Sequence, residues 1–209
     1  MALQFDFNGI KYEVLDEYQK TCRVCGQNYI CQDVVELPEA VSYEGVSYRL
    51  TEIGRYAFMD SHIKEIKLPN GIFKIDHFAF HRCNELRDVH LPESLISIGD
   101  EVFYCCYELR KIQLPQSLTD IGACCFEGSK NLQNIIIPDN VAHIGTGAFD
   151  NCWKLHTVHL GRGLKDAGNL LFSMCKKLRD VFLYQESVQY VQNLLSELAA
   201  LNVKVNIVQ

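Results

Sequence analysis

Hydrophobic residues recur along this chain at a fixed spacing of 23 residues. The spacing is clearest at four prolines, each of which follows a branched aliphatic residue: Leu68-Pro69, Leu91-Pro92, Leu114-Pro115 and Ile137-Pro138. The next two steps keep the aliphatic residue but not the proline, at Leu160-Gly161 and Leu183-Tyr184. A period of this length indicates a stack of structural repeats.

Other hydrophobic columns keep the same step. Two positions before the aliphatic residue stand Ile66, Val89, Ile112, Ile135, Val158 and Val181. Later in each unit comes a phenylalanine column: Phe80, Phe103, Phe126, Phe149 and Phe172, with Phe58 in a shorter first copy. A single unit cannot bury these residues alone, so we expect the units to stack and each column to become a continuous buried stripe.

Within one unit, the pattern predicts two short strands and a turn. Polar and apolar residues alternate from Lys64 to Leu68, which indicates a half-buried strand that the proline ends. A second extended segment is expected at pairs such as Leu95 and Ile98. The glycine column that follows is expected to supply a turn with positive φ, and Asp76 replaces it once as a left-handed residue. That column contains Gly54, Gly99, Gly122, Gly145 and Gly168.

The pattern divides the chain into a solenoid and two caps. We expect a right-handed solenoid of about six full coils over residues 46–184, an α/β repeat architecture that is mostly β. Residues 1–45 do not fit the repeat and predict a β-rich cap, with strands near 11–15, 21–24 and 33–37. Residues 185–209 predict a second cap: a helix from Ser187, its expected N-cap, to Leu201, then a strand over 202–208.

The repeat motif resembles that of the BspA-like subclass of leucine-rich-repeat proteins over residues 46–184. One unit carries Leu91-Pro92, Ile98-Gly99, Val102-Phe103 and Cys106, and another carries Ile137-Pro138, Ile144-Gly145, Ala148-Phe149 and Cys152. The resemblance implies a curved solenoid with a parallel sheet on its concave side, no catalytic residues, and a secreted or cell-surface protein linked to adhesion and host contact. The sequence departs from this pattern at Ser129 and Ala167, and it begins without a recognisable signal peptide.

Composition and charge narrow the possible functions. The chain has 209 residues and a formal net charge of -6, which argues against nucleic acid as a partner. No stretch approaches the ~18 uncharged apolar residues of a membrane helix, so no membrane insertion is expected. No phosphate loop, serine elbow or paired-carboxylate signature stands out, and we expect neither an enzyme nor a cofactor.

The ten cysteines and seven histidines offer few sites for metal. Cys83, Cys106, Cys152 and Cys175 occupy one column, where a small apolar residue beneath a turn is expected, mostly as reduced thiols. Cys22, Cys25 and Cys31 have a zinc-like spacing, but a fourth ligand is lacking and residues three apart on a strand face opposite sides. A disulfide is the alternative there. His77, His81 and Cys83 could form a weak site, although surface histidines are the expectation.

The outward positions of the predicted strands are the candidate ligand-binding residues. They are Lys67, His90, Gln113, Ile136, His159 and Phe182, and a second outward column contains Glu65, Asp88, Lys111, Asn134, Thr157 and Asp180. Exposed apolar side chains favour a contact centred on Ile136, His159 and Phe182, unless the C-terminal helix covers Phe182.

These positions predict a module that binds a protein ligand, and the family resemblance implies that this ligand is a host or matrix protein. Two alternatives remain: a structural spacer, and a carbohydrate-binding surface protein. For a carbohydrate, the exposed aromatic platforms would be Tyr104, Tyr107 and Trp153.

Overall fold

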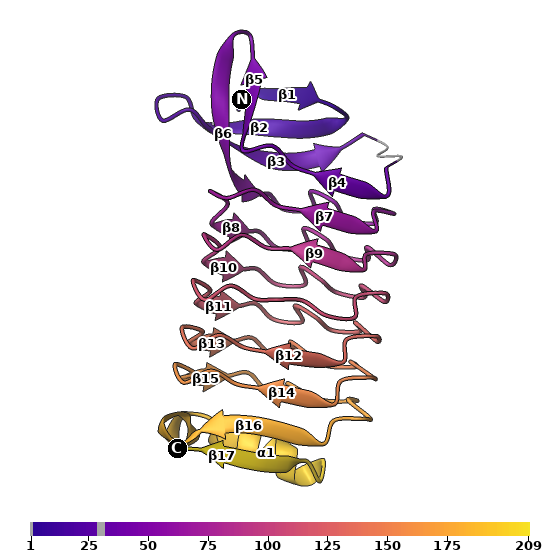
Figure 1. Ribbon diagram of the computed structural model, residues 1–209, viewed down its shortest axis with the longest axis vertical. Helices are drawn as coiled ribbons and strands as arrows, with labels where there is room; N and C mark the ends of the chain where they lie inside the picture. The colour runs from indigo at the N-terminus through magenta and orange to yellow at the C-terminus, as the bar shows by residue number, and fades with distance from the viewer. Residues whose placement is uncertain (1, 29–31) are drawn as a thin grey trace.

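The computed structural model describes residues 2–28 and 32–209. Short coils stack along the long axis of the molecule, with the N-terminal strands at one end and the C-terminal helix and strand at the other (Figure 1). The predicted mostly-β repeat solenoid with parallel strands is confirmed. Within the described residues, no helix has both the length and the hydropathy that a bilayer crossing requires.

The first strand column carries the alternating segments that end at the prolines. It contains β4 (Val34–Glu36), β7 (Glu65–Lys67), β9 (Asp88–His90), β12 (Asn134–Ile136), β14 (Thr157–His159), β16 (Asp180–Tyr184) and β17 (Lys204–Val208). The paired strands are all parallel, but they form two sheets, because residues 111–113 adopt no strand between β9 and β12. The apolar residue two positions before the branched aliphatic residue is buried in every coil from Ile66 to Val181, as predicted, and so is Ile112 in the coil without a strand.

The second strand column forms a ten-stranded sheet that continues into the N-terminal strands. Its members are β1 (Gln4–Phe7), β2 (Ile10–Asp16), β3 (Thr21–Gln27), β5 (Ala40–Tyr43), β6 (Val46–Ile53), β8 (Lys74–Ile75), β10 (Ser97–Ile98), β11 (Asp120–Ile121), β13 (His143–Ile144) and β15 (Asp166–Ala167). Strand β3 pairs antiparallel with β2 and parallel with β6. The N-terminal hairpins are therefore joined to the first coil by a shared sheet.

The phenylalanine column forms a buried stack between the two strand columns. Phe58, Phe80, Phe103, Phe126, Phe149 and Phe172 are each 0% exposed. Neighbouring rings lie 5.2 to 5.7 Å apart between centroids and are nearly parallel. One ring per coil thus fills the core beneath the turn.

The glycine column lies where successive coils approach most closely. The predicted positive φ is wrong, since neither these glycines nor Asp76 adopts it. A Cβ on Gly122 would lie 2.4 Å from the backbone nitrogen of Asp100, and one on Gly145 would lie 2.3 Å from that of Ala123. Glycine is required here because the backbone of the preceding coil leaves no room for a side chain.

The left-handed residues stand in two other columns, on either side of the phenylalanine. The first contains Tyr56, Phe78, Glu101, Cys124, Gly147 and Leu170, and the second contains Asp60, Arg82, Cys105, Gly128, Asn151 and Met174. Most are not glycine, and a left-handed residue with a side chain costs roughly 1–2 kcal/mol. The packed phenylalanine and the hydrogen bonds between coils hold them in this conformation.

Three backbone hydrogen bonds join each of these turns to the next coil. The amides of Glu101, Phe103 and Cys105, for example, donate to the carbonyls of Ala123, Cys125 and Glu127 at 2.7 to 2.9 Å. One repeat after the turn at residues 170–174 the chain forms a helix, and the Glu197 carboxylate takes the place of the next coil's carbonyls. It accepts from the amides of Leu171 at 2.9 Å and Phe172 at 2.7 Å.

Glu197 belongs to helix α1 (Gln192–Ala200), which follows a 3-10 helix (Gln185–Tyr190). The helical segment predicted from Ser187 is thus interrupted at Val191, and the predicted capping role of Ser187 is wrong. The Ser187 hydroxyl instead donates to the carbonyl of Arg162 at 2.9 Å. The apolar residues Val191, Leu194 and Leu198 are buried and close the last coil, before β17 pairs with β16.

The cysteine column supplies hydrogen-bond donors as well as small side chains. The thiols of Cys83, Cys152 and Cys175 donate to the phenylalanine carbonyls of preceding coils at 3.0 to 3.1 Å. The Ser129 hydroxyl makes the same bond to Phe103 at 3.0 Å. The column is buried beneath the turn as expected, and its thiols also act as donors; the serine fits because it preserves the donor.

All nine described cysteines are free thiols. Burial raises the pKa of the Cys83 and Cys175 thiols to about 12, and it holds the pKa of Cys106 and Cys152 well above the usual range. The thiolate is thus strongly disfavoured inside the solenoid. Cys31 lies outside the described residues.

The close approach between coils can be tested with two glycine substitutions. Gly122→Ala should lower the free energy of unfolding by at least about 2 kcal/mol, because the added methyl overlaps the preceding backbone. Gly45→Ala, at φ +79° with no neighbouring atom within 4 Å, should cost only about 1 kcal/mol. Urea denaturation measures both. Equal costs would mean that the contact between coils does not select glycine.

The buried thiols predict a loss of stability at alkaline pH. Their folded pKa lies above the ordinary value of 9.0, so the unfolded chain releases protons first and stability falls from pH 9 toward pH 12. The Cys83→Ser/Cys175→Ser variant keeps the donors but cannot ionise in this range. Between about pH 8 and about pH 10 it should lose about 1 kcal/mol less per replaced thiol than the wild type. Parallel stability curves, from urea titrations in reductant, would contradict this explanation.

Candidate functional site

The predicted ligand-binding residues lie along the exposed side of the first strand column. Lys67 pairs with His90 in register, and Ile136, His159 and Phe182 follow one another on β12, β14 and β16. Gln113 is exposed in the stretch without a strand. Register adds Glu36 at one end and Asn206 at the other, two positions that sequence analysis missed because they lie outside the repeat. We call these eight residues the outer strip: Glu36, Lys67, His90, Gln113, Ile136, His159, Phe182 and Asn206.

The N-terminal half of the outer strip is charged and internally paired. The Glu65 carboxylate lies 3.8 Å from the Lys67 ammonium and 3.4 Å from Nε2 of His90. A cation that already lies beside a carboxylate attracts an incoming ligand less strongly. This half is therefore the weaker candidate for a binding contact.

The C-terminal half of the outer strip is apolar and aromatic. Ile136 is 65% exposed, the largest exposed fraction among the valine, leucine and isoleucine side chains described. The rings of His159 and Phe182 stack at 4.3 Å between centroids and 1° between planes. Phe182 is half-buried, and Asn206 of β17 is its partner in register on the far side. The three residues lie side by side on neighbouring strands.

Each of the three aromatic residues predicted as glycan platforms has a ring face in contact with another side chain. Tyr104 stacks on His81 at 4.7 Å. The Lys130 ammonium lies 4.6 Å from the ring centroids of both Tyr107 and Trp153, and that of Lys176 lies 5.0 Å from Trp153. Residues one repeat apart stack along the solenoid axis, so a planar side chain turns its ring faces toward the neighbouring coils.

The histidine and cysteine clusters do not converge on a common point. His77 Nδ1 accepts from the amide of Asp100 at 3.0 Å, and His81 lies 3.3 Å from the Glu101 carboxylate. The Cys83 thiol is buried and directed at a carbonyl. Cys22 is buried on β3 while Cys25 is half-buried, as expected for opposite faces. Among residues 2–28 and 32–209, no three His, Cys, Asp or Glu side chains form a metal-binding group.

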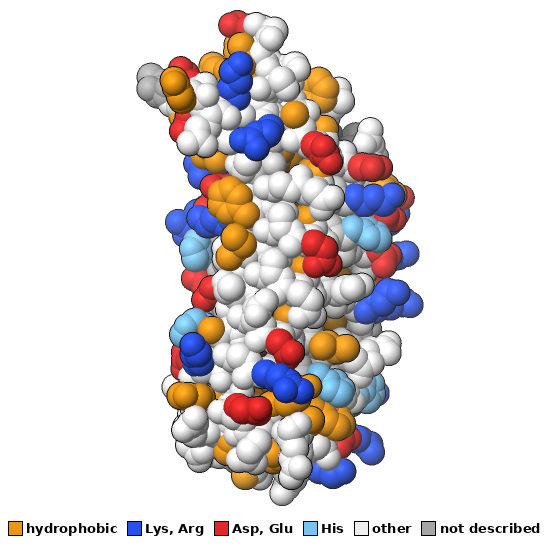
Figure 2. Space-filling model, turned by 60° about the vertical axis from the view of Figure 1, so that its left-hand side comes forward, with side chains coloured by type: hydrophobic (Ala, Val, Ile, Leu, Met, Phe, Trp, Pro, Cys, Tyr) orange, Lys and Arg blue, Asp and Glu red, His pale blue; other side chains and the backbone are white. Residues whose placement is uncertain are grey.

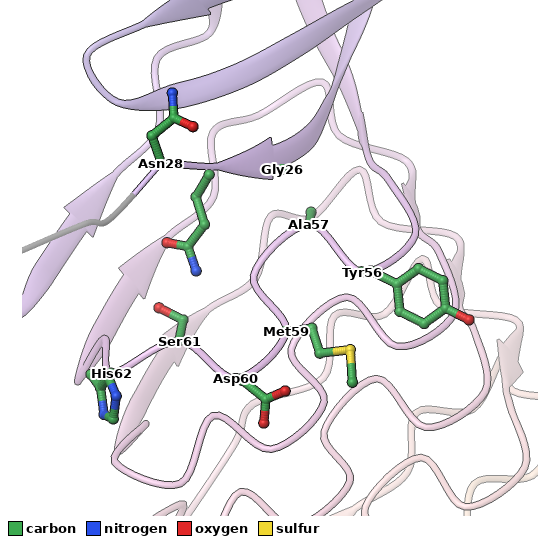
Figure 3. Close-up of a pocket in the computed structure, with 9 residues that line it drawn as sticks. Gly26, Asn28, Tyr56, Ala57, Met59, Asp60, Ser61 and His62 are labelled. Atoms are coloured by element: carbon green, nitrogen blue, oxygen red, sulfur yellow. The ribbon is translucent and has the colours of Figure 1, made fainter.

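A pocket lies between the end of β3 and the first turn of the solenoid (Figure 3). Asn28 comes from the strand side, and Asp60, Ser61 and His62 come from the turn. His62 lies 3.1 Å from Glu85, and the Ser61 hydroxyl accepts from the amide of Ile63 at 3.3 Å. Among the described residues that line this pocket, no nucleophile is hydrogen-bonded to a base. Nucleophilic catalysis needs such a pair.

A second exposed apolar pair lies beside the other strand column. Phe73 is 40% exposed and Ile96 is 47% exposed, and the amide of Ile96 donates to the carbonyl of Phe73. Figure 2 turns the side that carries β8 to β15 toward the viewer. Hydrophobic side chains on this face form small groups separated by charged and polar ones. This pair is therefore smaller in extent than a typical interface.

Comparison with known proteins identifies the repeat. Residues 51–195 match the model of the BspA type leucine rich repeat region in six copies. A leucine-rich repeat protein from Bacteroides ovatus is 35% identical, with a TM-score of 0.79 over 86% of this chain and 47% of its own. This chain thus spans about half the length of that protein. No curated protein matches at a significant level.

Two further structures share the fold at lower identity. The T. pallidum leucine rich repeat protein is 23% identical, with a TM-score of 0.78 over 98% of both chains. The pneumococcal vaccine antigen PcpA is 23% identical, with a TM-score of 0.79 over 90% of this chain and 51% of its own.

Solenoids of leucine-rich repeats are non-enzymatic scaffolds that generally mediate protein binding, and they do so through the extended surfaces that their stacked repeats create. The matched residues cover most of the present chain, including every coil that carries Ile136, His159 and Phe182. On these grounds the chain belongs to the BspA-type leucine-rich-repeat family.

Proposed function

We propose that this chain is a non-enzymatic protein-binding module whose contact centres on Ile136, His159 and Phe182. The observation that carries the proposal is the 65% exposure of Ile136 beside the stacked His159–Phe182 pair. Exposed apolar and aromatic residues held in fixed positions are what dominate protein interfaces. The rest of the outer strip would form the polar rim.

A protein ligand accounts for these side chains better than a glycan or a spacer does. A sugar ring stacks on a free aromatic face, whereas Trp153 is contacted by the ammonium groups of Lys130 and Lys176, and Tyr107 by that of Lys130. A spacer needs no exposed isoleucine beside an aromatic pair. The proposal therefore places the glycan and spacer alternatives second.

We also propose a secreted or cell-surface location and an adhesive role toward a host or matrix protein. Two structural relatives support the proposed location: one is described as a cell surface protein of Faecalibacterium prausnitzii, and the other as a pneumococcal vaccine antigen. Those descriptions apply to the relatives. For the present chain, location and ligand are proposals.

Reversing the polarity of the strip tests the proposed contact. Ile136→Asp/Phe182→Asp should abolish retention of partner proteins from host surface and matrix extracts, because charges would replace the central apolar contacts. The melting temperature should fall by only a few degrees, since Ile136 is exposed and Phe182 is half-buried.

The matched control is Leu170→Asp/Met174→Asp, which places the same charges at exposed turn positions away from the strip. This variant should retain the same partners as the wild type. Undiminished retention by the strip variant would move the contact elsewhere. A collapsed melting curve for the strip variant would show instead that the two side chains belong to the core.

A further inference from the structure

Cationic side chains gather at one corner of the solenoid. The corner is the stretch between the cysteine column and the first strand column in four successive coils: residues 107–111, 130–134, 153–157 and 176–180. It contains seven cations and two acidic residues, for a net charge of +5 in a chain whose net charge is -6. The cations are Arg110, Lys111, Lys130, Lys154, Lys176, Lys177 and Arg179, and the acidic residues are Glu108 and Asp180.

These seven cations have no carboxylate partner. In the part of the chain that the structure describes, none lies within 4.0 Å of an acidic oxygen. In the first coil, by contrast, Lys64 at the equivalent position pairs with Asp33. All seven except the half-buried Lys130 are exposed. The corner thus presents uncompensated positive charge in an otherwise acidic molecule.

Several of these ammonium groups are held in place. Lys130 lies between the rings of Tyr107 and Trp153, and Lys176 contacts the same tryptophan. The Lys154 ammonium donates to Oδ1 of Asn131 at 2.6 Å, and Asn131 in turn donates to the carbonyl of Tyr107 at 2.8 Å. Cation–π contacts and a neutral acceptor orient a lysine without cancelling its charge.

The corner continues directly into the outer strip. Asn134, Thr157 and Asp180 end the corner segments and also begin β12, β14 and β16. Two residues further along the same strands stand Ile136, His159 and Phe182. A ligand seated on the apolar part of the strip would therefore have the cations beside it.

We infer that the partner of this module is an acidic protein surface, with carboxylates over the corner and an apolar anchor on Ile136, His159 and Phe182. The inference rests on the proposed function and specifies its partner. An apolar contact next to the cations favours a protein over a simple polyanion. Sugars and nucleic-acid bases would need ring faces that Lys130 and Lys176 cover.

Two labelled peptides test the inference by fluorescence anisotropy: a poly-glutamate chain, and the same chain with a central Leu-Phe pair. Both should bind the wild type more weakly as salt rises from about 50 mM to about 200 mM, because screening shortens the range of the charges. The peptide with the apolar pair should bind at least about fivefold more tightly, as expected for about 1 kcal/mol of added contact.

Variants separate the two surfaces. Lys154→Glu/Lys176→Glu/Lys177→Glu should weaken both peptides at least about tenfold. Lys11→Glu/Lys20→Glu/Lys165→Glu changes the net charge equally at other exposed positions and should weaken them far less. Ile136→Asp/Phe182→Asp should remove the advantage of the apolar pair. Circular dichroism checks that each variant is folded.

Three outcomes would overturn the inference. Equal weakening by the two lysine variants would mean that only net charge matters. Unchanged binding by Lys154→Glu/Lys176→Glu/Lys177→Glu would show that the corner binds no carboxylates, whether or not the outer strip binds the apolar pair. If the apolar pair brings no advantage while duplex DNA or heparin binds with the same dependence on the corner lysines, the corner is a general polyanion site. In that last case the strip also fails as the contact, whereas failure of the corner alone leaves the proposed function standing.

Discussion

The close approach of successive coils is the constraint on which the rest of this structure depends. Where the glycine column passes, a Cβ on Gly122 or Gly145 would fall within 2.4 Å of the backbone before it. That proximity lets the neighbouring turns exchange three backbone hydrogen bonds per step, and it stacks one phenylalanine ring on the next. The first and last coils each lack one neighbouring coil. The N-terminal hairpins pair with the first coil, and the Glu197 carboxylate accepts hydrogen bonds from the last.

The same stacking shapes the surface. Any residue type repeated at one position becomes a row along the axis, so the outer strip and the cationic corner are rows and not isolated residues. It also turns planar side chains edge-on, as in the His159–Phe182 and His81–Tyr104 pairs. A surface of rows and ring edges suits an extended protein contact better than it suits the enclosed recognition of a small molecule.

Much of the fold follows from the period, because residues one repeat apart must be neighbours in a stack. Buried positions such as Ile66, Val158 and Phe126, and the outward strand positions between them, could be read from the sequence for this reason. The left-handed turn residues could not. Tyr56, Phe78 and Glu101 are not typical turn formers, and their φ values are imposed by packing around the phenylalanine. The cause of the glycine column was missed because a contact between coils is not visible within one repeat.

The site was only partly accessible from the sequence. Its central residues came from alternation, but the flanking Glu36 and Asn206 lie outside the repeat and depend on register with β7 and β16. The net charge of the corner can be counted from the sequence. Which of its lysines pair with a carboxylate depends on the fold. Lys64 does so across to Asp33, 31 residues away, whereas Lys154 and Lys177 find no carboxylate among the described residues.

Hydroxyl-radical footprinting of the module bound to its retained partner tests the central claim most directly. Oxidation of Ile136, His159 and Phe182 should fall on binding, while that of Phe73 and Ile96 on the other face should stay unchanged. Protection of Phe73 and Ile96 with Ile136 and Phe182 still fully reactive would contradict the assignment of the outer strip as the binding surface.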